Sequence, residues 1–199
     1  IVTFEEFPQQ YYRDAAGFGW DFRALEEQGK LRVIMTSPEV TRQDLESVGG
    51  MIETLVAEMG VKRILVDSLS HFERVAAGGI ALRETQFKFI NALKREGLTS
   101  VLTRESSTLF GQYEDTDQDN GVAFLVDSYI LLRYVEIDSA LRKALLVLKQ
   151  RGSEHDKDIR QYEITSKGIE VQAKFEGREG IMSGNARVSD AFYKAFLEQ

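Results

Sequence analysis

Short apolar runs alternate with amphipathic segments along the first 105 residues of the chain. The apolar runs are rich in β-branched residues, which favour strands, and the segments between them have helical spacing. We expect strands at 1–4, 31–35, 62–67 and 99–103, and helices at 8–17, 22–28, 41–60 and 82–97. Strands that alternate with helices are typical of a parallel sheet with crossover helices.

The segment 41–60 has the clearest helical periodicity. Thr41 is a suitable N-cap, and Asp44 occupies the capping-box position. Gly49-Gly50 interrupts the pattern, and each glycine costs a helix roughly 1 kcal/mol relative to alanine. We expect this pair to mark a close contact between the helix and the sheet. The apolar positions of the predicted helix are Leu45, Val48, Ile52, Leu55, Val56 and Met59.

The pattern changes after residue 105. A polar, acidic segment at 106–121 predicts a long loop, and closely spaced strand-like runs follow at 127–135, 140–149, 159–165 and 169–172. Short turns between such runs favour antiparallel pairing. The sequence therefore predicts an α/β fold in which a mainly parallel central sheet is extended by antiparallel strands on the C-terminal side. We expect one main domain at 1–173 and a tail at 174–199, with a short helix that places Val188, Phe192 and Phe196 on one face.

Composition narrows the class of protein. The 199 residues carry 25 basic and 32 acidic side chains, a net charge of −7, which argues against nucleic acid or an anionic membrane as a partner. The absence of cysteine excludes disulfides and thiolate metal sites. No apolar stretch reaches the roughly 18 residues of a membrane span. We expect a globular, cytoplasmic protein.

Polar side chains follow three of the predicted strands. Glu5 and Glu6 follow the first, Asp67 and Ser68 follow the third, and Thr103 ends the fourth. The carboxyl ends of parallel strands share one edge of a sheet, where α/β proteins bind ligands. An apolar strand that ends in Asp resembles a Walker B element, whose acid helps to hold Mg²⁺. Glu5 or Glu6 would then act as general base on water, and Thr103 would donate a hydrogen bond to the water or the phosphate.

Each of these motifs also has a purely structural interpretation. Many parallel strands end in Asp, a Glu-Glu pair commonly begins a solvated loop, and Thr103 can cap a helix. The same holds for Lys149 and Arg151, which share one face of an extended segment with His155 in the following turn. Two such cations can hold the phosphate of a nucleotide on a neighbouring subunit, or can be ordinary surface charges.

Five blocks of the chain resemble the KaiC branch of the RecA-type ATPases, the family of the cyanobacterial circadian clock ATPase. They are residues 2–6, 19–22, 64–70, 130–136 and 148–157. The resemblance implies a RecA-like three-layer fold, with Glu5 and Glu6 as catalytic glutamates and Asp67 as the Walker B acid. It implies that ATP and Mg²⁺ bind at subunit interfaces of a homo-oligomeric ring, usually a hexamer, with a regulatory or signalling role.

The resemblance also assigns residues around the nucleotide. It places Arg74 near the active site, where the strand ends already group Ser68 and Thr103 with Asp67. It implies that Lys149, Arg151 and His155 contact ATP bound to the adjacent subunit. The signalling partner is not readable from these residues.

The chain departs from the family at two places. No G-x-x-x-x-G-K-[ST] phosphate loop occurs in the sequence, although in the family it directly precedes the strand that begins at Ile1. We therefore expect a fragment that lacks the phosphate-loop strand and helix, and that alone binds ATP weakly and is inactive. Ala123-Phe124 stands where the clock protein has a phosphorylated Ser-Thr pair, so we expect no such phosphorylation cycle.

Two other functions remain open at this point. The chain can be a non-catalytic assembly or signalling module with the same fold. It can also be a RecA-type recombinase that binds single-stranded DNA, which the acidic side chains at 114–119 make the weakest alternative.

Overall fold

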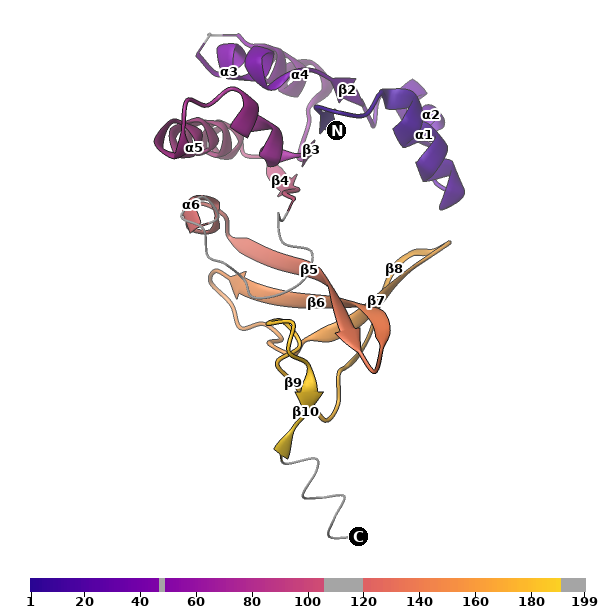
Figure 1. Cartoon of the computed structure of the whole chain (residues 1–199). Helices are drawn as coiled ribbons and strands as arrows, with labels where there is room; N and C mark the ends of the chain where they lie inside the picture. Colours follow the sequence, from indigo (N-terminus) through magenta and orange to yellow (C-terminus); the bar gives the residue numbers. More distant parts are fainter. Residues whose placement is uncertain (47–48, 106–119, 191–199) are drawn as a thin grey trace. The chain divides into compact units, whose positions relative to one another are not determined.

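The computed structural model of the chain describes residues 1–46, 49–105 and 120–190. These residues form two compact units (Figure 1). The first unit comprises residues 1–105 and 120–125, and the second comprises residues 126–190. No helix among the described residues is both long enough and apolar enough to cross a membrane.

The first unit is built on a parallel sheet with the strand order β2-β1-β3-β4. Val66 in the third strand is fully buried between the first and fourth strands, and it pairs in register with Val2 and Leu102. This confirms the predicted parallel sheet and its four strands. The strand bounds are β1 Val2–Thr3, β2 Ile34–Met35, β3 Arg63–Asp67 and β4 Thr99–Leu102.

Helices flank this sheet on both sides. Figure 1 shows α1 and α2 together at one side of the strands, and α3, α4 and α5 together at the other. Phe72 of the 3₁₀ helix η1 packs between Phe4 and Phe89, and it is fully buried. These three phenylalanine rings form part of the hydrophobic core of the first unit. The helix bounds are α1 Pro8–Gly17, α2 Phe22–Glu27, α3 Pro38–Glu46, α4 Met51–Met59, η1 Leu69–Arg74, α5 Gly79–Arg95 and α6 Asn120–Ala123.

The predicted single helix at 41–60 is wrong, because two helices occupy this segment. Gly49 has φ +76°, a left-handed conformation that glycine tolerates and that breaks a helix. The carboxylate of Asp44 accepts hydrogen bonds from the backbone N–H groups of Met51 and Ile52, and so caps α4 instead of supporting α3. Thr41 is buried inside α3, and Val48 lies outside the described residues.

The glycine pair also does not mark a contact with the sheet. A Cβ atom at position 50 would lie 2.6 Å from Oδ1 of Asp44, and a Cβ atom at position 49 would have no heavy atom within 4 Å. Gly50 is therefore close to the capping carboxylate. The predicted loop at 106–121 also ends early, since α6 begins at Asn120; residues 106–119 lie outside the described part of the chain.

The second unit is an antiparallel sheet with the strand order β5-β6-β7-β8. Its strands are β5 Ser128–Ile137, β6 Ala140–Gln150, β7 Arg160–Thr165 and β8 Gly168–Lys174, followed by the small hairpin β9 Arg178–Glu179 and β10 Arg187–Val188. The sheets confirm the predicted α/β class, with antiparallel strands following a parallel sheet.

Residues beyond β8 belong to the core of the second unit. Ile181 is buried against Val135, Ile137 and Ala144, and Phe175 packs against the same cluster. Val188 lies in β10, where its pairing with Arg178 makes the predicted helix at this position wrong. Phe192 and Phe196 lie outside the described residues, and the predicted domain boundary at 173/174 stays a prediction.

Candidate functional site at the carboxyl edge of the parallel sheet

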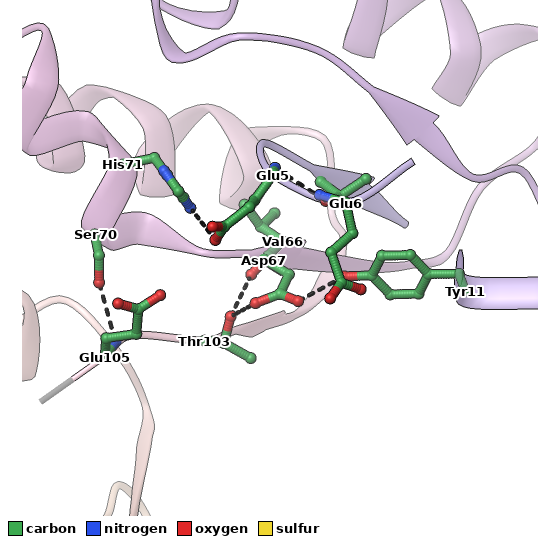
Figure 2. A network of polar contacts seen from close by, with 10 residues as sticks. Glu5, Glu6, Tyr11, Val66, Asp67, Ser70, His71, Thr103 and Glu105 are labelled. Carbon is green, nitrogen blue, oxygen red and sulfur yellow. Dashed lines mark hydrogen bonds and ion pairs between the residues drawn. The ribbon is translucent and has the colours of Figure 1, made fainter. Parts of the chain in front are cut away.

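The three predicted strand ends meet at one edge of the first unit. Thr3 pairs in register with Asp67, and Val66 pairs with Leu102, so the residues that follow β1, β3 and β4 leave the sheet side by side. Figure 2 shows Glu5, Asp67 and Thr103 within this single polar network. The structure thus brings together side chains that are 98 positions apart at the extremes, Glu5 and Thr103 (103 minus 5).

Asp67 is the centre of this network. Its Oδ1 accepts a hydrogen bond from the hydroxyl of Thr103 at 2.5 Å, and its Oδ2 accepts one from the hydroxyl of Tyr11 at 2.5 Å. The same hydroxyl lies 3.2 Å from the carbonyl oxygen of Val66, so its single proton is shared between two acceptors, of which Asp67 is the nearer. Both carboxylate oxygens are therefore oriented by hydroxyl groups. The peptide bond from Asp67 to Ser68 is cis.

Tyr11 is a member of the site that the sequence did not reveal. It lies on α1, and burial raises the pKa of its hydroxyl, with the hydrogen bond to Asp67 and the charge of that carboxylate adding to the rise. The phenol therefore stays protonated and donates to Asp67 at neutral pH. No motif or spacing links a tyrosine of the first helix to an aspartate 56 residues later.

Glu5 and Glu6 are held by the buried residue that precedes them. The hydroxyl of Thr3 accepts hydrogen bonds from the backbone N–H groups of Glu5 and Glu6, at 3.4 and 3.2 Å. This turn directs both carboxylates out of the sheet edge, where both are exposed. Figure 2 shows Glu5 facing His71, while Glu6 extends towards Tyr11.

A second cluster surrounds Glu5. Nε2 of His71 lies 3.4 Å from Oε2 of Glu5, and the backbone N–H of Glu105 donates to the hydroxyl of Ser70 at 3.0 Å. The ligating atoms of Glu5, His71 and Glu105 all lie within 4.8 Å of one another. Neither His71 nor Glu105 was assigned a role from the sequence alone. The signal was weak: His71 lies four positions after Asp67, and Glu105 two after Thr103.

Two other predicted residues belong to η1 or its cap. Ser68 is the N-cap of η1, and its buried hydroxyl makes no hydrogen bond within the described part of the chain. Arg74 is exposed at the end of η1. The roles of Ser68 and Arg74 stay predictions.

The cations predicted to act in trans lie in the second unit. Lys149 donates to the carbonyl of Val126 at 2.8 Å, and Arg151 forms an ion pair with Asp127 at 3.3 Å. The backbone N–H of Arg151 also donates to the carbonyl of Asp127. Both cations, at the end of β6, are thus held by residues 126–127, which directly precede β5. His155 is partly exposed in the loop that follows.

A parallel α/β sheet with acidic and hydroxyl side chains at its carboxyl edge, followed in the chain by an antiparallel sheet, is consistent with a RecA-like fold. The family model described as "ATPase: KaiC" matches residues 1–176. The chain belongs to this family.

Two relatives of the chain support the same assignment. The chain is 36% identical over 184 residues to the circadian clock protein KaiC3 of Synechocystis sp., a match that covers 92% of the chain and 35% of the relative. It is 36% identical over 190 residues to the circadian clock oscillator protein KaiC of Nostoc sp., covering 95% of the chain and 36% of the relative. The chain therefore spans about a third of the length of these relatives.

Proposed function

We propose that this chain carries the catalytic edge and the interface cations of a KaiC-type ATPase that binds and hydrolyses ATP between the subunits of a ring. The observation that supports this most directly is the convergence of Glu5, Glu6, Asp67 and Thr103 on one sheet edge. Phosphoryl transfer to water asks a protein for a placed base, a held metal ion and charge compensation.

Asp67 and Thr103 fit a Mg²⁺ site because they offer only oxygen atoms, the donors that this ion prefers. Asp67 would hold the ion through its water shell, and Thr103 and Tyr11 would keep the carboxylate in one orientation. Mg²⁺ supplies neutralisation of phosphate charge when it is bound. Glu5 and Glu6 are exposed to solvent, and one of them would take the proton of the attacking water.

Lys149, Arg151 and His155 would approach the nucleotide of the neighbouring subunit. A guanidinium and an ammonium group at the end of β6 can neutralise the charge that develops on the transferred phosphate. Arg74, at the end of η1, would lie near the active site that contains Asp67 on the same chain. We further propose a hexameric ring in the cytoplasm that regulates a signalling partner.

Binding of the ATP phosphates requires a phosphate loop, which the residues of this site do not provide. The sequence holds no G-x-x-x-x-G-K-[ST] motif, whose backbone N–H groups and lysine cradle the phosphates. We therefore propose that the chain binds ATP weakly by itself, and that a phosphate loop joined ahead of Ile1 restores binding and turnover. Micromolar ATP affinity of the chain alone, measured by calorimetry, would contradict this.

The test of catalysis uses the chain fused at Ile1 to a segment that carries the phosphate loop of the family. Hydrolysis of ATP should fall at least about 100-fold in the double variant Glu5→Gln, Glu6→Gln, because the base is lost, while ATP affinity stays the same. Glu58→Gln is the matched control, since Glu58 is an exposed glutamate on α4. Full turnover in the double variant would refute the assignment of these glutamates.

The second candidate function is a non-catalytic assembly or signalling module with the same fold. That function predicts that the fusion protein forms rings but does not hydrolyse ATP, whatever residue occupies positions 5 and 6.

A further inference from the structure

We propose that Glu5, His71 and Glu105 form a binding site for a divalent transition-metal ion such as Zn²⁺, distinct from the Mg²⁺ site proposed at Asp67. Each residue offers one ligating atom, and the three atoms lie within 4.8 Å of one another. Figure 2 shows the imidazole and the two carboxylates around one small space at the sheet edge.

His71 provides the fixed ligand of this site. Its side chain is 6% exposed, and its ring packs against Phe4 with 6.0 Å between the ring centroids. Its Nε2 faces Oε2 of Glu5 at 3.4 Å. Two ligands at roughly 2.1 Å from a tetrahedral ion are about 3.4 Å apart, so this pair already has the separation that Zn²⁺ requires.

Glu105 is anchored beside the same 3₁₀ helix. Its backbone N–H donates to the hydroxyl of Ser70, and the N–H of Leu69 donates to the carbonyl of Thr103 at 2.9 Å. These bonds tie the end of β4 to η1 on either side of Arg104. The side chains of Glu5 and Glu105 are exposed, so their carboxylates can rotate inward to close the ligand set.

The ligand types select the class of metal. One imidazole nitrogen with two carboxylates suits Zn²⁺, Co²⁺ or Mn²⁺, whereas Mg²⁺ prefers oxygen alone. Two negative carboxylates also balance the charge of a divalent ion. Three protein ligands leave a fourth position for water. A consequence that rests on the proposed function is that bound Zn²⁺ would withdraw Glu5 from hydrolysis, so excess Zn²⁺ would inhibit the ATPase.

Binding is tested with Co²⁺ on the chain itself, without ATP, so that the result does not depend on the ATPase assignment. We expect one equivalent of Co²⁺ to give a visible absorption band, which Zn²⁺ displaces. Loss of a supporting partner already weakens metal sites roughly 10- to 100-fold, so Glu5→Gln and Glu105→Gln should each weaken binding at least about tenfold.

Two matched controls separate this site from general binding by surface groups. Glu6→Gln changes the neighbouring carboxylate, and His155→Asn changes the second of the two histidines in the sequence. Both variants should bind Co²⁺ as the unchanged chain does, and His71→Asn should not bind it. If His71→Asn fails to fold by circular dichroism, the two glutamate variants decide. No Co²⁺ band in the unchanged chain, or undiminished affinity in Glu105→Gln, would overturn the proposal and leave an ordinary ion pair between His71 and Glu5.

Discussion

The hydroxyl of Thr103 lies 2.5 Å from Oδ1 of Asp67 and joins the ends of two neighbouring strands. The hydroxyl also lies 3.2 Å from the carbonyl oxygen of Val66, so its one proton is shared between a backbone acceptor and the nearer carboxylate. This geometry orients the acid that we propose holds the water shell of Mg²⁺. The residue at the end of β4 must therefore carry a hydroxyl group that can donate a hydrogen bond to Asp67.

Thr103→Val should therefore impair both stability and catalysis. The variant loses hydrogen bonds to Asp67 and Val66, at a cost of about 1 kcal/mol in the free energy of unfolding by urea. In the fusion that carries a phosphate loop, ATP turnover should fall roughly 10- to 100-fold because Asp67 is no longer oriented. Thr103→Ser keeps the hydroxyl and should retain most of both. Equal turnover in the valine and serine variants would show that this bond has no catalytic role.

Tyr11 makes the stability of the first unit sensitive to alkaline pH. The pKa of Tyr11 is raised above its ordinary value of 10.0, mainly by burial and then by the bond to Asp67. Its contribution to stability is complete below about pH 10 and declines as the pH rises further, because the unfolded chain releases this proton first. In Tyr11→Phe, the free energy of unfolding should fall less steeply between pH 10 and 11 than in the unchanged chain.

Urea unfolding at a series of pH values measures this difference. Tyr129→Phe in the second unit is the control for the removal of a tyrosine hydroxyl outside the first unit. Superimposable alkaline declines for Tyr11→Phe and the unchanged chain would contradict the buried bond to Asp67.

The break between α3 and α4 depends on Asp44. Asp44→Ala removes the acceptor for the first N–H groups of α4 and should lower the free energy of unfolding by about 1 kcal/mol. Asp44→Asn keeps an acceptor oxygen and should lose less. Gly49→Ala should also destabilise by about 1 kcal/mol, because alanine is strained at φ +76°. A gain in stability for Gly49→Ala would instead favour one continuous helix.

Mixing two inactive variants tests whether Arg151 acts across a subunit interface. Two variants of the fusion are made. One carries Arg151→Ala, and the other carries both Glu5→Gln and Glu6→Gln. Each variant alone should hydrolyse little ATP. When equal amounts of the two variants assemble at random into rings, about a quarter of the head-to-tail interfaces combine a subunit with intact glutamates and a neighbour with an intact arginine. Turnover should therefore recover on mixing. No recovery in rings shown to have exchanged subunits would place Arg151 outside the neighbouring site.

Much of the fold was predictable because its strands are short apolar runs that end in polar residues. Asp67 and Thr103 were found in this way, since the ends of parallel strands share an edge. The segment 41–60 was not predicted correctly. Its apolar residues have helical spacing on both sides of the break. That spacing shows neither that Gly49 adopts a left-handed conformation nor that Asp44 caps α4.

The missing members of the site are residues whose partners lie far away in the sequence. His71 faces Glu5 across 66 positions (71 minus 5), and Tyr11 reaches Asp67 across 56. Helical or strand periodicity reports only on neighbours within a few residues. Tertiary contacts of this kind need the strand order β2-β1-β3-β4, which brings β1 beside β3.

The dependence of ATP turnover on Mg²⁺ tests the proposed role of the sheet edge most directly. In the fusion that carries a phosphate loop, Asp67→Asn keeps the size of the side chain but removes its charge. The variant should need at least about tenfold more Mg²⁺ for half-maximal turnover, and its maximal rate should fall. An Asp67→Asn variant with unchanged Mg²⁺ dependence and unchanged turnover would contradict the assignment of this edge as the catalytic centre.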